Sequence, residues 1–245
     1  MVDISVVNDE VDLEGYYLVE GLPGVGLVAK IASDFLIQKL EMEPYAEIYC
    51  DDFSSVTVFE RDNPELKAAV RVFIDRESKV AVLKSDVPVS AESKNFMDSV
   101  TDWMGEEKLK PVFQIGLPVD VEGEGEKYMF HVKNGDIPGM NNVEFNDPPV
   151  AGGISGPTGA LLEQALKKDM DVLALVIESG AFPDPEGSKQ LIDEGIGPVT
   201  GIDIDTGKLK EKADQIREQK KKLAENLRKS PEKKASEAYP REMYT

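Results

Sequence analysis

The segment Val172–Ile177 is an uninterrupted run of apolar residues that lies between a predicted helix and a polar loop. It has the length of a strand and is too short for a separate helix. A strand that is apolar on both faces needs cover on both faces, as parallel strands have in α/β proteins. This run therefore predicts a central sheet with helices on each side.

The rest of residues 1–205 alternates in the same way between strand and helix patterns. A β-rich run at 16–20 is followed by a glycine turn at 21–26 and by helical apolar spacing over 27–37. This alternation predicts one α/β domain over 1–205, with a parallel or mixed central sheet flanked by helices. Further strands are expected at 47–50, 56–60, 68–74, 79–83, 111–117 and 128–132, and helices at 90–104, capped by Ser90, and at 160–168.

The chain carries 47 acidic and 28 basic residues, and the two kinds are unevenly distributed. Residues 1–207 hold 40 acids and 16 bases, a net charge of -24, whereas residues 208–245 hold 7 acids and 12 bases, a net charge of +5. Nucleic acids and anionic membranes are polyanions, so the acidic body is not expected to bind either one. The excess of carboxylates has two equally good explanations. It keeps the protein soluble, or it is an adaptation to a salt-rich cytosol, where screening removes the repulsion between these charges.

The basic segment predicts a C-terminal helix over 206–229. Its apolar residues follow an imperfect heptad seam, which suits packing on its own body or on a sister subunit. Residues 230–245 are polar and broken by proline, so we expect a flexible tail. The seam consists of Leu209, Ala213, Ile216, Leu223 and Leu227, with Lys220 at the missing position.

The reactive residues are few. Cys50 and His131 are the single cysteine and histidine, which leaves little for thiolate clusters, histidine metal sites or a nucleophile–histidine triad. None of Ser155, Thr158 and Ser179 lies in the G-x-S-x-G motif that exposes a nucleophilic serine on a sharp turn. Glu178 ends a predicted strand, but a carboxylate-only catalytic site usually needs a second positioned carboxylate, and none is evident. We expect no cofactor, no metal and no catalytic residues. The lone cysteine, the absence of a long apolar span and an N-terminus without basic residues predict a cytoplasmic protein.

Two glycine-rich loops are candidates for binding a ligand. Residues 24–29 fit the dinucleotide fingerprint G-x-G-x-x-A, with two aspartates at 51–52, and a second glycine loop at 152–159 precedes a helix. Either loop could present backbone amides to a phosphate, or could be a tight turn that needs small residues. The candidate loop residues are Gly21, Gly24, Gly26, Gly153, Gly156 and Gly159.

The chain ends in Met243, Tyr244 and Thr245, a hydrophobic residue, a tyrosine and a final residue with a free carboxylate. The carboxylate can pair with a lysine, the tyrosine offers an apolar ring with a polar tip, and methionine fills a small hollow. This ending is therefore a candidate for docking on a partner.

These features together resemble the archaeal branch of the PAC2 family, the proteasome assembly chaperones. The resemblance rests on Gly21–Val28, on Gly153–Gly159, on Ala181–Glu186 and on the Met243–Thr245 ending. It implies an α/β fold similar to that of nucleoside phosphorylases, a homo-oligomer, and binding to the α subunits of the 20S proteasome. By the same resemblance Met243, Tyr244 and Thr245 would dock in pockets between α subunits.

The leading hypothesis is therefore a non-enzymatic proteasome assembly chaperone or activator-like protein. The alternative is an enzyme or sensor that binds a nucleotide or another phosphate ligand at the loops 21–29 and 152–159. An oligomeric scaffold for other partners is a third possibility.

Overall fold

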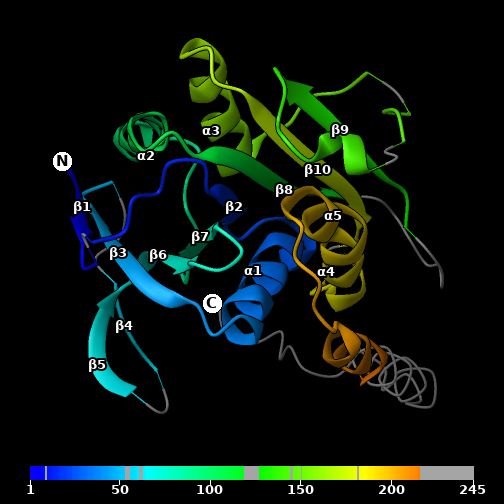
Figure 1. Cartoon of the computed structure of the whole chain (residues 1–245), viewed down its shortest axis with the longest axis horizontal. Helices are drawn as coiled ribbons and strands as arrows, with labels where there is room; N and C mark the ends of the chain where they lie inside the picture. The colour runs from blue at the N-terminus through cyan, green and yellow to red at the C-terminus, as the bar shows by residue number, and fades with distance from the viewer. Residues whose placement is uncertain are drawn as a thin grey trace, which may run out of the picture.

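The structure is a computed structural model that describes residues 1–8, 10–52, 56–60, 63–118, 127–143, 146–149, 151–180 and 182–215. Its centre is an eight-stranded sheet with the strand order β1-β3-β6-β7-β2-β8-β10-β9 (Figure 1). A separate hairpin is formed by β4 (Thr57–Glu60) and β5 (Asn63–Ala68). The eight strands are β1 (Val2–Val6), β2 (Tyr17–Gly21), β3 (Glu43–Cys50), β6 (Val70–Asp75), β7 (Val80–Ser85), β8 (Lys110–Pro118), β9 (Met129–Asn134) and β10 (Val172–Ser179).

The sheet is mixed. Strands β7, β2, β8 and β10 are parallel to one another, with Tyr17 opposite both Val80 and Lys110 and with Leu173 opposite Val112. Strand β9 is antiparallel to β10, and β1, β3, β6 and β7 form antiparallel pairs. The carboxyl ends of the four parallel strands therefore lie along one edge, which is where α/β proteins usually place their sites.

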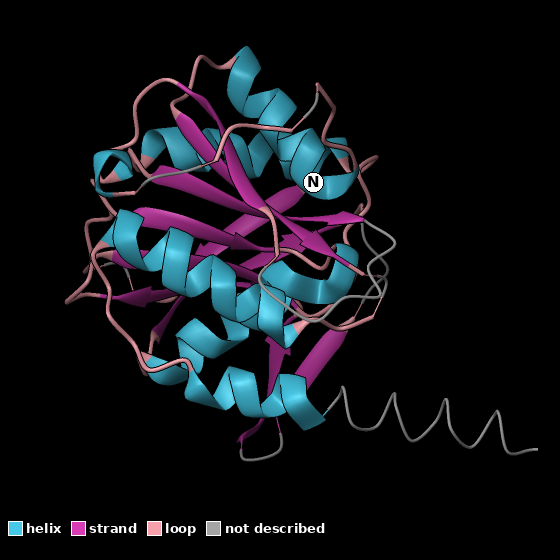
Figure 2. Ribbon diagram, turned by 90° about the vertical axis from the view of Figure 1, so that its right-hand side faces the viewer, coloured by secondary structure: helices cyan, strands magenta, loops and turns pink. Residues whose placement is uncertain are grey.

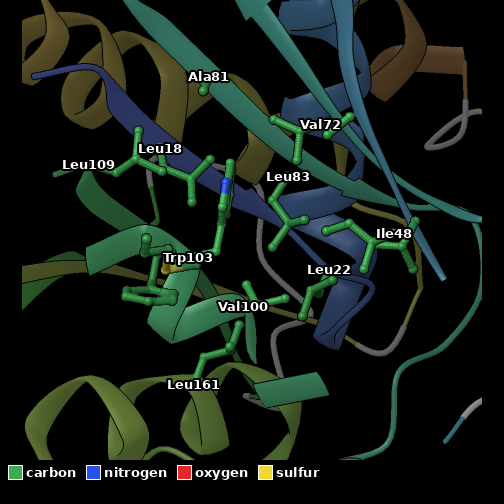
Figure 3. Close-up of a cluster of buried hydrophobic side chains, with 14 of the residues drawn as sticks. Leu18, Leu22, Ile48, Val72, Ala81, Leu83, Val100, Trp103, Leu109 and Leu161 are labelled. Carbon is green, nitrogen blue, oxygen red and sulfur yellow. The ribbon is translucent and has the colours of Figure 1, made fainter. Parts of the chain in front are cut away.

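Helices cover both faces of this sheet (Figure 2). Helices α2 (Lys94–Glu106) and α3 (Gly156–Lys167) pack on one face, where a core cluster joins Leu18, Leu83 and Trp103 (Figure 3). The other face carries α1 (Val28–Lys39), α4 (Pro185–Gln190), the π-helical turns Leu191–Ile196 and α5 (Gly197–Thr200), over a second core cluster. Short 3-10 turns lie at Val25–Leu27 and Met140–Asn142.

Strand β10 confirms the prediction made from its apolar run. Val172 and Ala174 belong to the first core cluster, whereas Leu173, Leu175 and Ile177 belong to the second. Because successive side chains of a strand point to opposite faces, a run without polar residues is required where both faces are covered. The predicted α/β fold with a mixed sheet is confirmed.

Several predicted boundaries differ from the structure. Helix α2 begins at Lys94 with Ser93 at its N-cap, so Ser90 is not the cap. Ser90 instead forms a turn, in which its hydroxyl accepts a hydrogen bond from the Glu92 amide and its carbonyl accepts one from Ser93. Helix α3 begins at Gly156, earlier than predicted, because Pro157 has the fixed backbone angle that suits a first helical turn. Strand β1 was not predicted, and the strand expected at 68–74 is divided between β5 and β6.

Residues 207–215 are helical, and Leu209 and Ala213 are buried against the body. The rest of the predicted helix 206–229 and the predicted tail 230–245 lie outside the described residues. Within the described part of the chain, no helix combines the length and the apolar character needed to cross a bilayer.

Two leucines of α3 provide a matched test of this packing. Leu161 is 1 % exposed within the first core cluster, whereas Leu166 on the same helix is 55 % exposed. Leu161→Ala should lower the free energy of unfolding by about 2–5 kcal/mol through a buried cavity. Leu166→Ala should lower it by less than about 1 kcal/mol. Urea titration of both variants measures the difference, and equal losses would contradict the placement of α3.

Candidate functional site

The loop between β2 and α1 passes close to the carboxyl ends of the parallel strands. A Cβ atom added to Gly21 would lie 2.4 Å from the Ser33 hydroxyl oxygen on α1. Gly26 has a φ of +63°, and a Cβ atom there would lie 1.9 Å from the Ser179 hydroxyl oxygen. Both glycines are thus required by close internal packing. Gly24 is exposed, and a Cβ atom there would meet no atom within 4 Å.

The second glycine loop is built in a similar way. A Cβ atom on Gly159 would lie 2.5 Å from the Ile154 carbonyl oxygen, and Gly156 has a φ of +79°. Gly153 is exposed, and its Cβ position is open. The backbone therefore accounts for Gly156 and Gly159, whereas Gly24 and Gly153 have no packing role of this kind.

The structure does not support the dinucleotide geometry suggested by residues 24–29. In that fold a helix leads from the glycine turn directly to a neighbouring parallel strand that carries the acidic residue. Here α1 leads to β3, which is separated from β2 by β6 and β7. Asp51 contacts the N-terminal ammonium group, and Asp52 accepts hydrogen bonds from Asn95, so both aspartates are engaged away from the glycine turn.

A buried carboxyl group lies beneath the two loops. Glu20 is the second-last residue of β2 and is 0 % exposed. One of its oxygens accepts hydrogen bonds from the Leu22 amide at 2.8 Å and from the Thr158 hydroxyl at 3.4 Å, and the other accepts one from the Gln114 amide at 3.5 Å. Burial raises the pKa of Glu20 to about 8, although these three hydrogen bonds act in the opposite direction. Glu20 is therefore mostly protonated at neutral pH.

Gln114 connects this carboxyl group to the opposite face of the sheet. Its side-chain amide donates to the Glu20 carbonyl oxygen at 2.7 Å and to the Ser33 hydroxyl at 3.1 Å. Glu20 meets α3 through Thr158, whereas Ser33 belongs to α1 on the other layer. These buried polar groups fix both helical layers to the same edge of the sheet.

A second polar cluster lies at the end of β10. The Ser179 hydroxyl donates to an Asp184 oxygen at 2.8 Å, and the Lys127 ammonium group forms an ion pair with the same oxygen. The other Asp184 oxygen caps α4 by accepting a hydrogen bond from the Gly187 amide, and the Asp184 amide donates to the Gly26 carbonyl oxygen. Asp184 thus joins β10, α4 and the first glycine loop.

The chemistry available at this edge is limited. Ser179 is fully buried, and its carboxylate neighbour is already engaged with a lysine. His131 lies on β9 opposite Leu175, and burial, aided by the nearby Lys133, lowers its pKa. Glu178 accepts a hydrogen bond from the Tyr128 amide. Among the described residues, no three His, Cys, Asp or Glu side chains are grouped so as to hold a metal ion.

The sequence analysis did not identify Glu20, Gln114, Asp184 or Lys127. A signal for Glu20 was present, because an acid stands beside a glycine turn at the end of an otherwise apolar strand. Nothing in the sequence connects Lys127 with Asp184, which are 57 positions apart. The predicted docking residues Met243, Tyr244 and Thr245 lie outside the described residues.

Replacing Glu20 should change how stability depends on pH. Its pKa in the folded chain, about 8, is higher than the ordinary value of 4.5. The folded state therefore binds more protons, and the contribution of Glu20 to stability is lost as the pH rises from 4.5 through 8. In Glu20→Gln this loss should disappear, which changes the slope of unfolding free energy by about 1.4 kcal/mol per pH unit. Urea titrations between pH 5 and pH 9 measure both slopes, and parallel slopes would contradict the assignment.

Alanine substitutions at two glycines between β2 and α1 distinguish a glycine that is needed for packing from one that is not. Gly26→Ala should cost about 2–4 kcal/mol, because it combines left-handed backbone strain with a clash against Ser179. Gly24→Ala should stay within about 0.5 kcal/mol of the parent. Adding Ser179→Ala to Gly26→Ala should recover part of the loss, so a double-mutant cycle by chemical denaturation checks the contact. Strictly additive effects would argue against it.

Comparison with known proteins assigns a family to this fold. The chain is 27% identical over 239 residues to the uncharacterized protein MJ0106 of Methanocaldococcus jannaschii, covering 96% of each chain. Its fold is similar to Pyrococcus furiosus PbaA, described as an archaeal homolog of proteasome-assembly chaperone, with a TM-score of 0.77, 18% identity and 93% of each chain covered. It is equally similar to Pyrococcus furiosus PbaB, described as an archaeal proteasome activator, with a TM-score of 0.77, 23% identity and coverage of 91% of this chain and 98% of PbaB. The PAC2 family model matches residues 18–224, and the chain therefore belongs to the PAC2 family.

Proposed function

We propose that this chain is a non-enzymatic proteasome assembly chaperone or activator-like protein that binds α subunits of the 20S proteasome through its C-terminal tail. The main support is the family match over residues 18–224 together with a fold shared with PbaA and PbaB. Both relatives are described in terms of the proteasome, one as a homolog of an assembly chaperone and one as an activator.

The docking site in this proposal is the end of the C-terminal tail. Met243 and Tyr244 supply apolar surface, and Thr245 carries the terminal carboxylate, which a lysine in a receptor pocket can pair with. A homo-oligomer would present several such tails at once. Because linked binding events become intramolecular, weak single contacts then combine into a much stronger one.

The residues at the carboxyl ends of the parallel strands are consistent with a binding role. Burial raises the pKa of Glu20, so this acid is mostly neutral at pH 7, and Ser179, Asp184 and Lys127 are engaged with one another. The alternative, a phosphate ligand at the loops 21–29 and 152–159, loses one of its arguments because packing and backbone angles account for most of the glycines. A nucleotide at 100 times its dissociation constant would stabilise the chain by about 2.7 kcal/mol, so a thermal-shift screen tests that alternative.

Removing Met243–Thr245 should abolish proteasome binding without affecting the fold. We expect at least tenfold less 20S proteasome to be retained by the truncated chain in a pull-down, with the same thermal midpoint as the parent. Tyr244→Ala should show most of this loss. Tyr239→Ala is the matched control, because it removes a tyrosine from the same segment outside the final tripeptide, and it should bind as the parent does. Retention of the proteasome by the truncated chain would reject the tail as the docking site.

A further inference from the structure

Strand β1 is an open edge of the central sheet. It pairs with β3 in continuous register from Val2 to Val6 and stands at one end of the strand order (Figure 1). The opposite edge, β9, is partly covered, because Phe130 forms a bridge with Asn146 and the Asn146 side-chain amide donates to the Met129 carbonyl oxygen at 2.8 Å. Of the two edges, β1 is therefore the one that the described residues leave open.

The hydrogen bonds at the two ends of β1 show which of its backbone groups face β3. The Val7 amide donates to the Tyr45 carbonyl oxygen at 2.8 Å, and the Asp51 amide donates to the Met1 carbonyl oxygen at 3.2 Å. Because hydrogen-bonded and non-hydrogen-bonded pairs alternate along an antiparallel ladder, the odd-numbered residues of β1 are the ones bonded to β3. The N–H and C=O groups of the even-numbered residues point away from the sheet, and within the described part of the chain they have no hydrogen-bond partner. These residues are Val2, Ile4 and Val6.

The sequence of β1 lacks the devices that usually protect an edge strand. Its residues are Val-Asp-Ile-Ser-Val, with neither lysine nor proline, and its pairing with β3 contains no bulge between Val2 and Val6. The β-branched side chains favour an extended strand. An edge with unpaired backbone groups and no such protection is a template on which a further strand can pair.

The strand is complementary to itself when it is turned about a two-fold axis at Ile4. The outward groups of Ile4 then face those of Ile4 of the partner subunit, and the outward groups of Val2 face those of Val6 of the partner subunit. Each such pair can exchange two N–H···O bonds. Asp3, the charged residue of the strand, faces Ser5 of the partner subunit, whereas a register centred on Asp3 would place two like charges opposite each other.

The apolar side chains of β1 agree with the same arrangement. Val2 and Ile4 are partly buried against the first core cluster, on the face of the sheet that α2 covers. Val6 lies on the same face, because alternate residues of a strand share a face, and it is 38 % exposed. In a two-fold pair Val6 gains cover from Val2 of the partner subunit. The pairing would therefore bury apolar surface as well as join the two backbones.

We propose that β1 pairs antiparallel with β1 of a second copy of this chain, centred on Ile4, so that the two eight-stranded sheets become continuous. A two-fold contact of this kind uses the same surface on both subunits and is closed once the pair has formed. This inference goes beyond the proposed function, because it concerns only contacts between copies of the chain and requires no proteasome.

Proline at the outward positions tests the pairing with little effect on the subunit. Ile4→Pro removes an N–H that is not bonded to β3, and edge strands tolerate proline at such positions. Sedimentation should show the intact chain as a dimer or a larger oligomer, and Ile4→Pro should have half that mass or associate at least tenfold more weakly. Val6→Pro removes the outward N–H of the end pairs and should act in the same direction. Ile4→Val is the matched control, because it keeps both the N–H and a β-branched side chain, and it should associate as the parent does.

A cysteine at the two-fold axis tests the register. Residues opposite each other in a hydrogen-bonded pair have Cα atoms about 5.5 Å apart, which is within the range of a disulfide. Ile4→Cys should therefore form a disulfide-linked dimer on mild oxidation, which non-reducing electrophoresis detects and a reductant reverses. Ser5→Cys is the matched control and should not be linked, because in this register it faces Asp3 of the partner subunit. Both variants carry Cys50→Ser, since the natural cysteine lies opposite Val2 on β3.

Each other result supports or rejects the pairing. A monomeric parent chain, or proline variants that keep the mass of the parent, would overturn the proposal, as would linkage of Ser5→Cys without linkage of Ile4→Cys. Phe59 on β4 is 74 % exposed and offers a different apolar contact. If Phe59→Glu dissociates the oligomer whereas Ile4→Pro and Val6→Pro do not, the second copy binds the β4–β5 hairpin and the assignment to β1 is wrong. Circular dichroism checks that each variant is folded, and if Ile4→Pro is not, Val6→Pro and the linkage of Ile4→Cys decide. No proteasome is present in these experiments, so their result is independent of the pull-down.

Discussion

The close approach of the first glycine loop to the ends of β2 and β10 is the constraint on which the rest of the carboxyl edge depends. Because Gly21 has no side chain, Ser33 of α1 can lie directly against it, and Ser179 of β10 lies against Gly26 in the same way. The Gly26 carbonyl oxygen then receives the Asp184 amide, and Asp184 in turn caps α4. A side chain at either glycine would push a helix away from the sheet, so the small residues hold this layer in place.

The buried Glu20 belongs to the same arrangement on the other side of the sheet. A carboxyl group without a nearby cation is accommodated in such a place mainly in its neutral form, since burial disfavours the charged one. In that form it still accepts hydrogen bonds from the Leu22 amide and Thr158, which connect it to both glycine loops. The edge that holds ligands in many α/β proteins is here filled by the chain's own polar groups.

The sequence predicted the fold because the signals for it are local. The apolar run at 172–177 and the glycine turn before α1 each specify an element from neighbouring residues alone. The site was harder to predict, because its contacts join distant positions, such as Lys127 with Asp184 and Glu20 with Thr158. Strand β1 escaped prediction because a short edge strand is specified by pairing with β3, a contact that depends on tertiary structure.

A tail that docks through an apolar pair and a carboxylate has recognition chemistry that more than one receptor can satisfy. Added salt weakens the attraction between the basic segment and the acidic body, but it leaves the burial of methionine and tyrosine largely intact. In a salty cytosol the apolar contacts would therefore determine how strongly the tail binds a partner, and the large negative charge would contribute mainly to solubility.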